Sequence, residues 1–171
     1  YTLTWAAGAG VYKGQGVQPP GRELGVITSR TDVLLVVDGI SGIGICPCPM
    51  DDWKLDCVLT GSQKGLMLPP GLALIALSER AWAKAATVTT GNYYFDLNKE
   101  RKNILKDQTA FPPAIGLRMG LNERLEIFME AGLESAFRKQ WALCCMARSG
   151  VLPLVLELSA PSAPASGGPS L

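Results

Sequence analysis

Two side chains in this sequence are well suited to chemistry: an acid and an amine that each follow an apolar run. Asp38 ends a run at residues 33–37, and Lys64 lies in a polar, glycine-bounded turn after residues 56–60. Neighbouring parallel strands would bring both side chains to one edge of a sheet, where open α/β sheets bind ligands. A buried carboxylate is costly unless a cationic or protonated group faces it, so we expect Asp38 to face such a group. The alternatives are a plain Asp–Lys ion pair and a ligand site built from both residues.

The composition excludes several other kinds of site. The chain has 171 residues and contains no histidine. This excludes Ser/His/Asp triads, Cys/His dyads, His-ligated zinc sites and an imidazole base. The five cysteines are an odd number with irregular spacing, so we predict neither a disulfide framework nor a metal site.

Charge and hydropathy argue against two classes of partner. Sixteen Lys and Arg against fifteen Asp and Glu give a formal net charge of +1, which provides no electrostatic footprint for nucleic acid or an anionic membrane. The longest apolar stretch, residues 66–77, is interrupted by Pro69, Pro70 and Gly71, so no transmembrane segment is predicted. We therefore expect no nucleic-acid partner and no membrane partner.

The elements that must position Asp38 and Lys64 are predicted from periodicity and capping signals. Residues 33–37 are all apolar and mostly β-branched, which is typical of a strand buried on both faces of a parallel sheet. Further strands are predicted at 56–60 and 72–77, and Ser78 is predicted to cap a short helix that runs to Lys84. Helical spacing of apolar residues predicts longer helices over 117–128 and 134–147, and a weaker turn at 22–28. The predicted fold class is α/β.

The two ends of the chain are expected to differ from its middle. Residues 1–15 are rich in glycine and predict an irregular segment, while residues 159–171 are mainly Ser, Ala, Pro and Gly and predict a disordered tail. The chain also begins with Tyr1 rather than Met. We therefore expect the sequence to be a fragment or a processed product.

Several motifs lie in the same order as in one known family. The motifs are Val36-Val37-Asp38-Gly39, Gly61-Ser62-Gln63-Lys64-Gly65 with Pro69-Pro70-Gly71, Ser78-Glu79-Arg80-Ala81-Trp82, Tyr93-Tyr94-Phe95-Asp96-Leu97 and Gly132-Leu133-Glu134. Together they resemble the class V aminotransferases of pyridoxal-phosphate fold type I, in the alanine–glyoxylate and serine–pyruvate branch. The resemblance spans residues 16–148 and is strongest in the lysine motif.

The resemblance implies a domain organisation. Residues 16–116 would form part of the cofactor-binding large domain, with a mainly parallel sheet flanked by helices. Residues 117–158 would form a helical connection toward a small domain that lies outside this chain. The family's glycine-rich phosphate turn, its ring-stacking aromatic residue and its substrate-binding arginine have no match here, which agrees with a fragment.

The resemblance also implies roles for individual residues around pyridoxal 5'-phosphate. Lys64 would hold the cofactor as a Schiff base and then move protons, and Asp38 would keep the ring nitrogen protonated. Ser62 and Gln63 match positions near the phosphate, and Ser41 matches a polar position beside the ring. Pro112 stands where the family usually has a threonine that reaches the partner subunit's phosphate, and Thr109 could partly substitute for it.

The function implied by the resemblance is transamination. A small amino acid of the alanine or serine type would donate its amino group to a 2-oxo acid such as glyoxylate or pyruvate, and the full-length parent would be a homodimer. The expected location is cytoplasmic, with peroxisomal and mitochondrial locations left open. Cysteine desulfurases look similar but have a histidine where Gln63 stands, which argues against that activity. Two alternatives remain: a catalytically inactive remnant that only folds or dimerises, and a binding module with an ordinary Asp–Lys pair.

Overall fold

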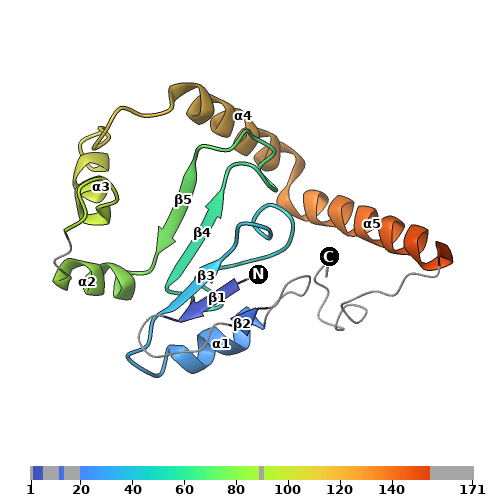
Figure 1. Ribbon diagram of the computed structural model, residues 1–171, viewed down its shortest axis with the longest axis horizontal. Helices are drawn as coiled ribbons and strands as arrows, with labels where there is room; N and C mark the ends of the chain where they lie inside the picture. The colour runs from blue at the N-terminus through green and yellow to red at the C-terminus, as the bar shows by residue number, and fades with distance from the viewer. Residues whose placement is uncertain (1, 6–11, 14–19, 89–90, 155–171) are drawn as a thin grey trace.

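A mixed β-sheet with helices beside it forms the centre of the protein (Figure 1). The computed structural model describes residues 2–5, 12–13, 20–88 and 91–154. The strands of this part of the chain are β1 (Thr2–Trp5), β2 (Tyr12–Lys13), β3 (Leu35–Asp38), β4 (Cys57–Gly61) and β5 (Ala73–Leu77). They are arranged in the order β2-β1-β3-β4-β5.

The strand directions confirm the α/β class but correct the expected sheet, which is mixed rather than mainly parallel. Strands β3 and β4 are parallel, with Val36 opposite Cys57 and Asp38 opposite Leu59. Strand β5 is antiparallel to β4, and β1 is antiparallel to both β2 and β3. A parallel crossover usually needs a helix, and the short connection from β4 to β5 contains none, so the chain turns back directly.

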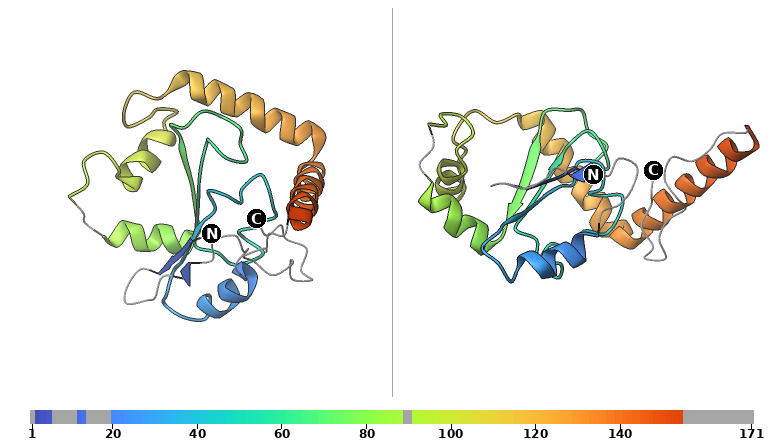
Figure 2. Two further views of the ribbon diagram at one scale, coloured as in Figure 1. Left: turned by 45° about the vertical axis from the view of Figure 1, so that its right-hand side comes forward. Right: turned by 60° about the horizontal axis from the view of Figure 1, so that its bottom comes forward.

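Helices surround the sheet on several sides. They are α1 (Gly21–Thr28), α2 (Glu79–Thr87), α3 (Leu97–Ile104), α4 (Ile115–Ala131) and α5 (Leu133–Val151), followed by a 3-10 turn (Leu152–Leu154). The predicted cap is confirmed, since the Ser78 side chain accepts a hydrogen bond from the Ala81 amide at the start of α2. Gly132, with φ of 76°, separates α4 from α5. Figure 2 shows α2, α3 and α4 curving around one side of the sheet while α5 extends away from it.

Two regions differ from the expectations drawn from the sequence. Helix α3 lies in a stretch where no helix is predicted, because its residues are mostly polar, and Asp96 caps it by accepting from the amides of Asn98 and Lys99. Strands β1 and β2 lie within residues 1–15, where an irregular segment is predicted. Pairing with β3 accounts for β1, whose alternating polar and apolar residues suit a strand. The predicted disordered tail lies outside the described residues.

The core lies between α1 and the β3–β4 pair. Leu35, Leu55 and Val58 are buried together, and Leu24 of α1 packs against them. Helices α4 and α5 contribute less to the interior, with one buried residue each, Phe128 and Cys144. No helix among the described residues combines the length and the apolar character that crossing a membrane requires.

Candidate active site at the carboxyl ends of strands β3 and β4

Asp38 lies at the carboxyl end of β3 and is half-buried. Its Oδ1 accepts a hydrogen bond of 2.9 Å from the Ile40 amide, which turns the chain sharply after the strand. The amide of Gly39, the residue between Asp38 and Ile40, donates to the Leu59 carbonyl of β4 at 2.8 Å. These bonds fix the aspartate at the edge of the sheet and leave its second oxygen without a hydrogen bond among the described residues.

The lysine loop, residues 62–72, connects β4 to β5 and carries Lys64. Gln63 and Lys64 are exposed, whereas Ser62 is completely buried, with 0% of its surface accessible. The Ser62 hydroxyl donates to the Pro69 carbonyl at 2.7 Å and accepts from the Leu72 amide at 3.2 Å. The Ser62 hydroxyl is therefore engaged within the loop, and its predicted contact with a phosphate stays a prediction.

The loop after Asp38 and the lysine loop are in direct contact. A Cβ added to Gly65 would overlap the carbonyl oxygen of Ile43, and one added to Gly44 would lie 3.2 Å from the Gly65 carbonyl. Gly44 also has a φ of 81°, a conformation that glycine adopts without strain. The absence of side chains at positions 44 and 65 thus allows the two loops to touch next to Lys64.

Asp38 and Lys64 are brought to the same edge of the sheet, as the sequence predicts, but they do not form an ion pair. The ion pairs within the described ranges are Arg80 with Asp56 and, at 4.0 Å, Arg101 with Glu79. The structure therefore contradicts the alternative of a plain Asp38–Lys64 pair. An amine and a carboxylate remain available at this edge for a ligand.

The other two predicted site residues, Ser41 and Thr109, are both exposed. Ser41 belongs to the turn that follows Asp38, so it is near the site. Thr109 belongs to the connection between α3 and α4, and no described contact joins it to the lysine loop. The structure thus places Asp38, Ser41, Gln63 and Lys64 in neighbouring loops and leaves the role of Thr109 a prediction.

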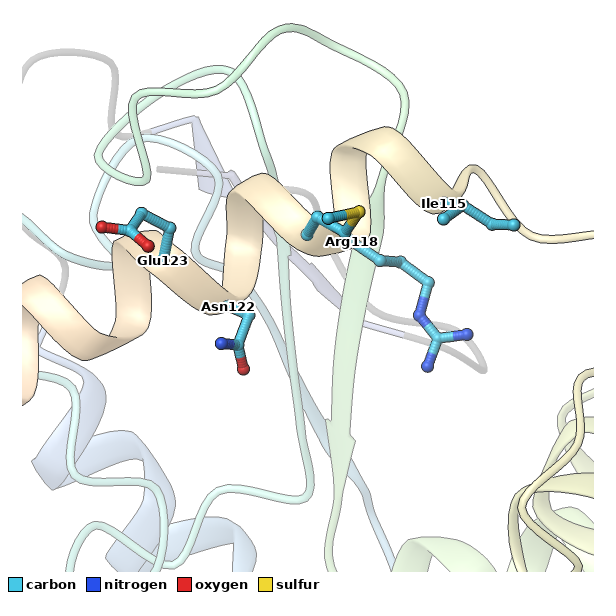
Figure 3. Close-up of a pocket in the computed structure, with 5 residues that line it drawn as sticks. Ile115, Arg118, Asn122 and Glu123 are labelled. Carbon is cyan, nitrogen blue, oxygen red and sulfur yellow. The ribbon is translucent and has the colours of Figure 1, made fainter.

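An open depression along α4 is separate from these residues. Figure 3 shows side chains of one helix around it. It has a volume of about 510 Å³ and is lined by Ile115, Arg118, Met119, Asn122 and Glu123. Because none of the predicted site residues lines it, we do not include it in the candidate site.

A second polar cluster lies at the amino ends of β3 and β4. It is not among the sites predicted from the sequence. The Asp56 carboxylate, in a residue that is 3% exposed, accepts from the Leu35 amide, the Ser78 hydroxyl, and Nε and Nη2 of Arg80. Arg80 donates its remaining hydrogens to the carbonyls of Thr28, Thr31 and Val33. This Arg80–Asp56 cluster joins the end of α1, the start of β3, the start of β4 and the start of α2.

The Arg80–Asp56 cluster stabilises the ionised form of its carboxylate. Burial raises the pKa of Asp56, but the hydrogen bonds from Arg80, the Leu35 amide and Ser78 outweigh it, so this pKa lies below its ordinary value. All four of its acceptor positions face protein donors, which makes this aspartate a structural residue. The signal available in the sequence is an acid directly before one strand and an arginine two residues after a helix cap.

Comparison with known families agrees with this geometry. The model of the family described as aminotransferase class-V matches residues 10–156, which include the two strands, the lysine loop and helices α1 to α5. The chain belongs to the class V aminotransferase family. Members of this family have the pyridoxal-phosphate fold type I and depend on pyridoxal 5'-phosphate, so the expected family, fold and cofactor are confirmed.

Among three proteins similar to this chain, two are named as aminotransferases. The chain is 38% identical over 135 residues to a serine–glyoxylate aminotransferase of Methylorubrum extorquens, covering 75% of this chain and 33% of the relative. It is 37% identical over 140 residues to a Synechococcus protein named as the small subunit of a soluble hydrogenase, covering 82% and 36%. The crystal structure of an alanine–glyoxylate aminotransferase from Nostoc matches with a TM-score of 0.80 and 26% identity over 85% of this chain and 40% of that chain. This chain of the class V family thus spans about a third of the length of the curated relatives it matches.

Proposed function

We propose that this chain forms the lysine-bearing part of a pyridoxal-phosphate-dependent aminotransferase. Its parent would move an amino group from a small amino acid, of the alanine or serine type, to a 2-oxo acid such as glyoxylate or pyruvate. The observation that carries the proposal is the placement of Asp38 and Lys64 at one edge of the parallel β3–β4 pair without an ion pair between them. The substrate class is supported by the serine–glyoxylate and alanine–glyoxylate aminotransferases that resemble the chain.

The residues at this edge fit the cofactor chemically. Lys64 is an exposed amine that no described residue engages, so it is available to bond to an aldehyde carbon. Asp38 is held by the Ile40 amide through one oxygen, and its other oxygen is available to a protonated ring nitrogen. When bound, pyridoxal phosphate supplies the electron sink that makes the substrate's Cα–H acidic.

The remaining chemistry belongs to the side chains of this chain. Lys64 would accept the Cα proton of the substrate at Nζ and return a proton to the bound molecule. The Asp38 carboxylate would stabilise the protonated form of the ring nitrogen. The amide of Gln63 and the hydroxyl of Ser41 can donate hydrogen bonds to ligand oxygens at the same edge.

The proposal is tested by adding pyridoxal phosphate to the purified chain and recording its visible absorption spectrum. Borohydride reduction and peptide mapping then locate the modified lysine. We expect one dominant adduct at Lys64, lost in Lys64→Ala and retained in Lys106→Ala, which removes an exposed lysine just beyond α3. An adduct spread evenly over surface lysines would contradict the proposal.

The alternative, an inactive remnant, is supported by the short span of the chain relative to its relatives. An assay of amino transfer from alanine or serine to glyoxylate separates the two. Turnover that depends on Lys64 would support the proposal that the chain is an active aminotransferase. A specific adduct at Lys64 without turnover supports a chain that retains the cofactor site but not the reaction.

A further inference from the structure

We propose that Ser62 is a positioning residue that fixes the lysine loop and thereby the backbone of Lys64. This inference rests on the proposed function, and it assigns to Ser62 a role different from a contact with the cofactor phosphate. The residue acts from inside the loop, where its side chain is fully buried. Lys64 lies on the exposed side of the same loop, two residues further along.

Ser62 connects the start of the loop to its end through every polar group it has. Its amide donates to the Leu72 carbonyl at 3.1 Å, and its carbonyl accepts from the Leu68 amide at 3.0 Å. Its hydroxyl donates to the Pro69 carbonyl at 2.7 Å and accepts from the Leu72 amide at 3.2 Å. One serine therefore closes the loop with four hydrogen bonds, two of which depend on its side chain.

The other residues of the loop offer few alternative anchors. Gln63, Lys64 and Met67 are exposed, as are Pro69, Pro70 and Gly71, whereas Leu66 is buried. Met67 has a φ of 58°, in the left-handed region that non-glycine residues rarely occupy. Such a conformation persists only where surrounding bonds hold it. The Met67 amide donates to the Lys64 carbonyl at 2.8 Å, and the following amide, that of Leu68, donates to the Ser62 carbonyl.

A second fixed point follows Lys64 directly. Gly65 packs against the carbonyl of Ile43 so closely that a Cβ could not be accommodated without movement. Lys64 thus lies between the buried Ser62 and the packed Gly65. This arrangement holds the Lys64 backbone while its exposed side chain stays free to move, which suits an amine that must first bond to the cofactor and then transfer protons.

The test compares Ser62→Ala with Ser78→Ala. Ser78 is a matched control, because its hydroxyl also makes one donated and one accepted hydrogen bond, but at the Arg80–Asp56 cluster. Two properties are measured in each variant: the rate at which pyridoxal phosphate is reduced onto Lys64 relative to other lysines, and the hydrogen exchange of the Leu68 and Leu72 amides. A general loss of stability would change both variants alike.

We expect Ser62→Ala to lower the relative labelling of Lys64 about tenfold, the scale expected when buried hydrogen bonds are lost. It should also accelerate exchange at Leu68 and Leu72, while Ser78→Ala leaves both properties near those of the wild type. Gly65→Ala should lower Lys64 labelling as well, because the added Cβ meets the Ile43 carbonyl. Unchanged labelling and unchanged exchange in Ser62→Ala would overturn the inference.

The same experiment separates this inference from the proposed function. If the wild-type chain is not labelled at Lys64, the cofactor proposal fails, and the exchange data alone decide the role of Ser62. Faster exchange at Leu68 and Leu72 in Ser62→Ala only would then support Ser62 as the anchor of the loop. Equal exchange in both variants would reject it.

Discussion

The two ends of the parallel pair formed by β3 and β4 are built in opposite ways. At the amino ends, Asp56 is buried and all of its acceptor positions face donors from Arg80, Ser78 and Leu35. At the carboxyl ends, Asp38 is half-buried and accepts one hydrogen bond, from the Ile40 amide, while Lys64 is exposed. The first aspartate holds four elements together, and the second keeps an oxygen available.

This difference separates structural from functional charges. A carboxylate surrounded by protein donors is too strongly satisfied to serve a ligand, and its removal leaves buried donors without partners. A carboxylate held by one backbone amide at a strand end costs little to expose and can bind something else. The contrast predicts that substitutions at the amino ends reduce stability and substitutions at the carboxyl ends reduce cofactor binding.

The largest effect is expected for Arg80→Met. This change removes the cation but keeps much of the side-chain volume, so the buried Asp56 carboxylate loses its main partner. We expect the free energy of unfolding to fall by about 2–3 kcal/mol, less than for a fully buried ion pair, because the Arg80 side chain is 37% exposed and water partly replaces its charge. Urea unfolding measures it, with Arg118→Met on the exposed side of α4 as control. Equal stability of the two variants would contradict the structural role of the Arg80–Asp56 cluster.

A second effect is a loss of stability in acid that depends on Asp56. Its pKa is lowered in the folded protein, so the unfolded chain binds the proton more readily. The contribution is therefore complete above the unfolded pKa of about 3.9 and is lost as the pH falls through the lower folded value. The stability difference between the wild type and Asp56→Asn should stay constant from neutral pH down to about pH 4 and shrink below that pH in urea unfolding. A difference independent of pH would contradict this account.

A smaller effect is expected for Ser78→Ala. The change removes the cap of α2 and one of the hydrogen bonds to Asp56. Loss of a capping serine costs about 1 kcal/mol, and Arg80 remains to neutralise the carboxylate. Thermal or urea unfolding measures the loss. A decrease as large as that of Arg80→Met would show that Ser78, rather than the cation, dominates the cluster.

The smallest effect on stability is expected for Asp38→Asn. Asparagine retains an oxygen that can accept from the Ile40 amide, so the free energy of unfolding should change by no more than about 0.5 kcal/mol. The visible spectrum with pyridoxal phosphate should nevertheless differ from that of the wild type, because a neutral amide does not stabilise a protonated ring nitrogen. A large stability loss with an unchanged spectrum would make Asp38 a structural residue like Asp56.

Local patterns in the sequence predicted much of the central fold. The three strands predicted from apolar runs match β3, β4 and β5, and the cap at Ser78 is where its residue type and position indicate. These features depend on a few neighbouring residues, so a single sequence contains the information. The shared edge of Asp38 and Lys64 followed from one further assumption, that the first two strands are parallel neighbours, which the register confirms.

Features that depend on distant residues were not predictable in the same way. The Arg80–Asp56 cluster joins segments far apart in the chain, and the buried carboxylate that faces a cation is Asp56 and not Asp38. Helix α3 has few apolar residues, so periodicity did not reveal it. The inward position of the Ser62 hydroxyl depends on how the loop closes, which no pattern around the lysine motif indicates.

The antiparallel connection from β4 to β5 has a consequence for the order in which the site forms during folding. This hairpin and the lysine loop involve contacts between residues close in sequence, and hairpins form within about 1–10 μs. The parallel pairing of β3 with β4 must bring together more distant segments and is expected to follow more slowly. The backbone around Lys64 is therefore expected to be in place before Asp38 reaches it. The later step, the docking of β3 onto β4, completes the pair.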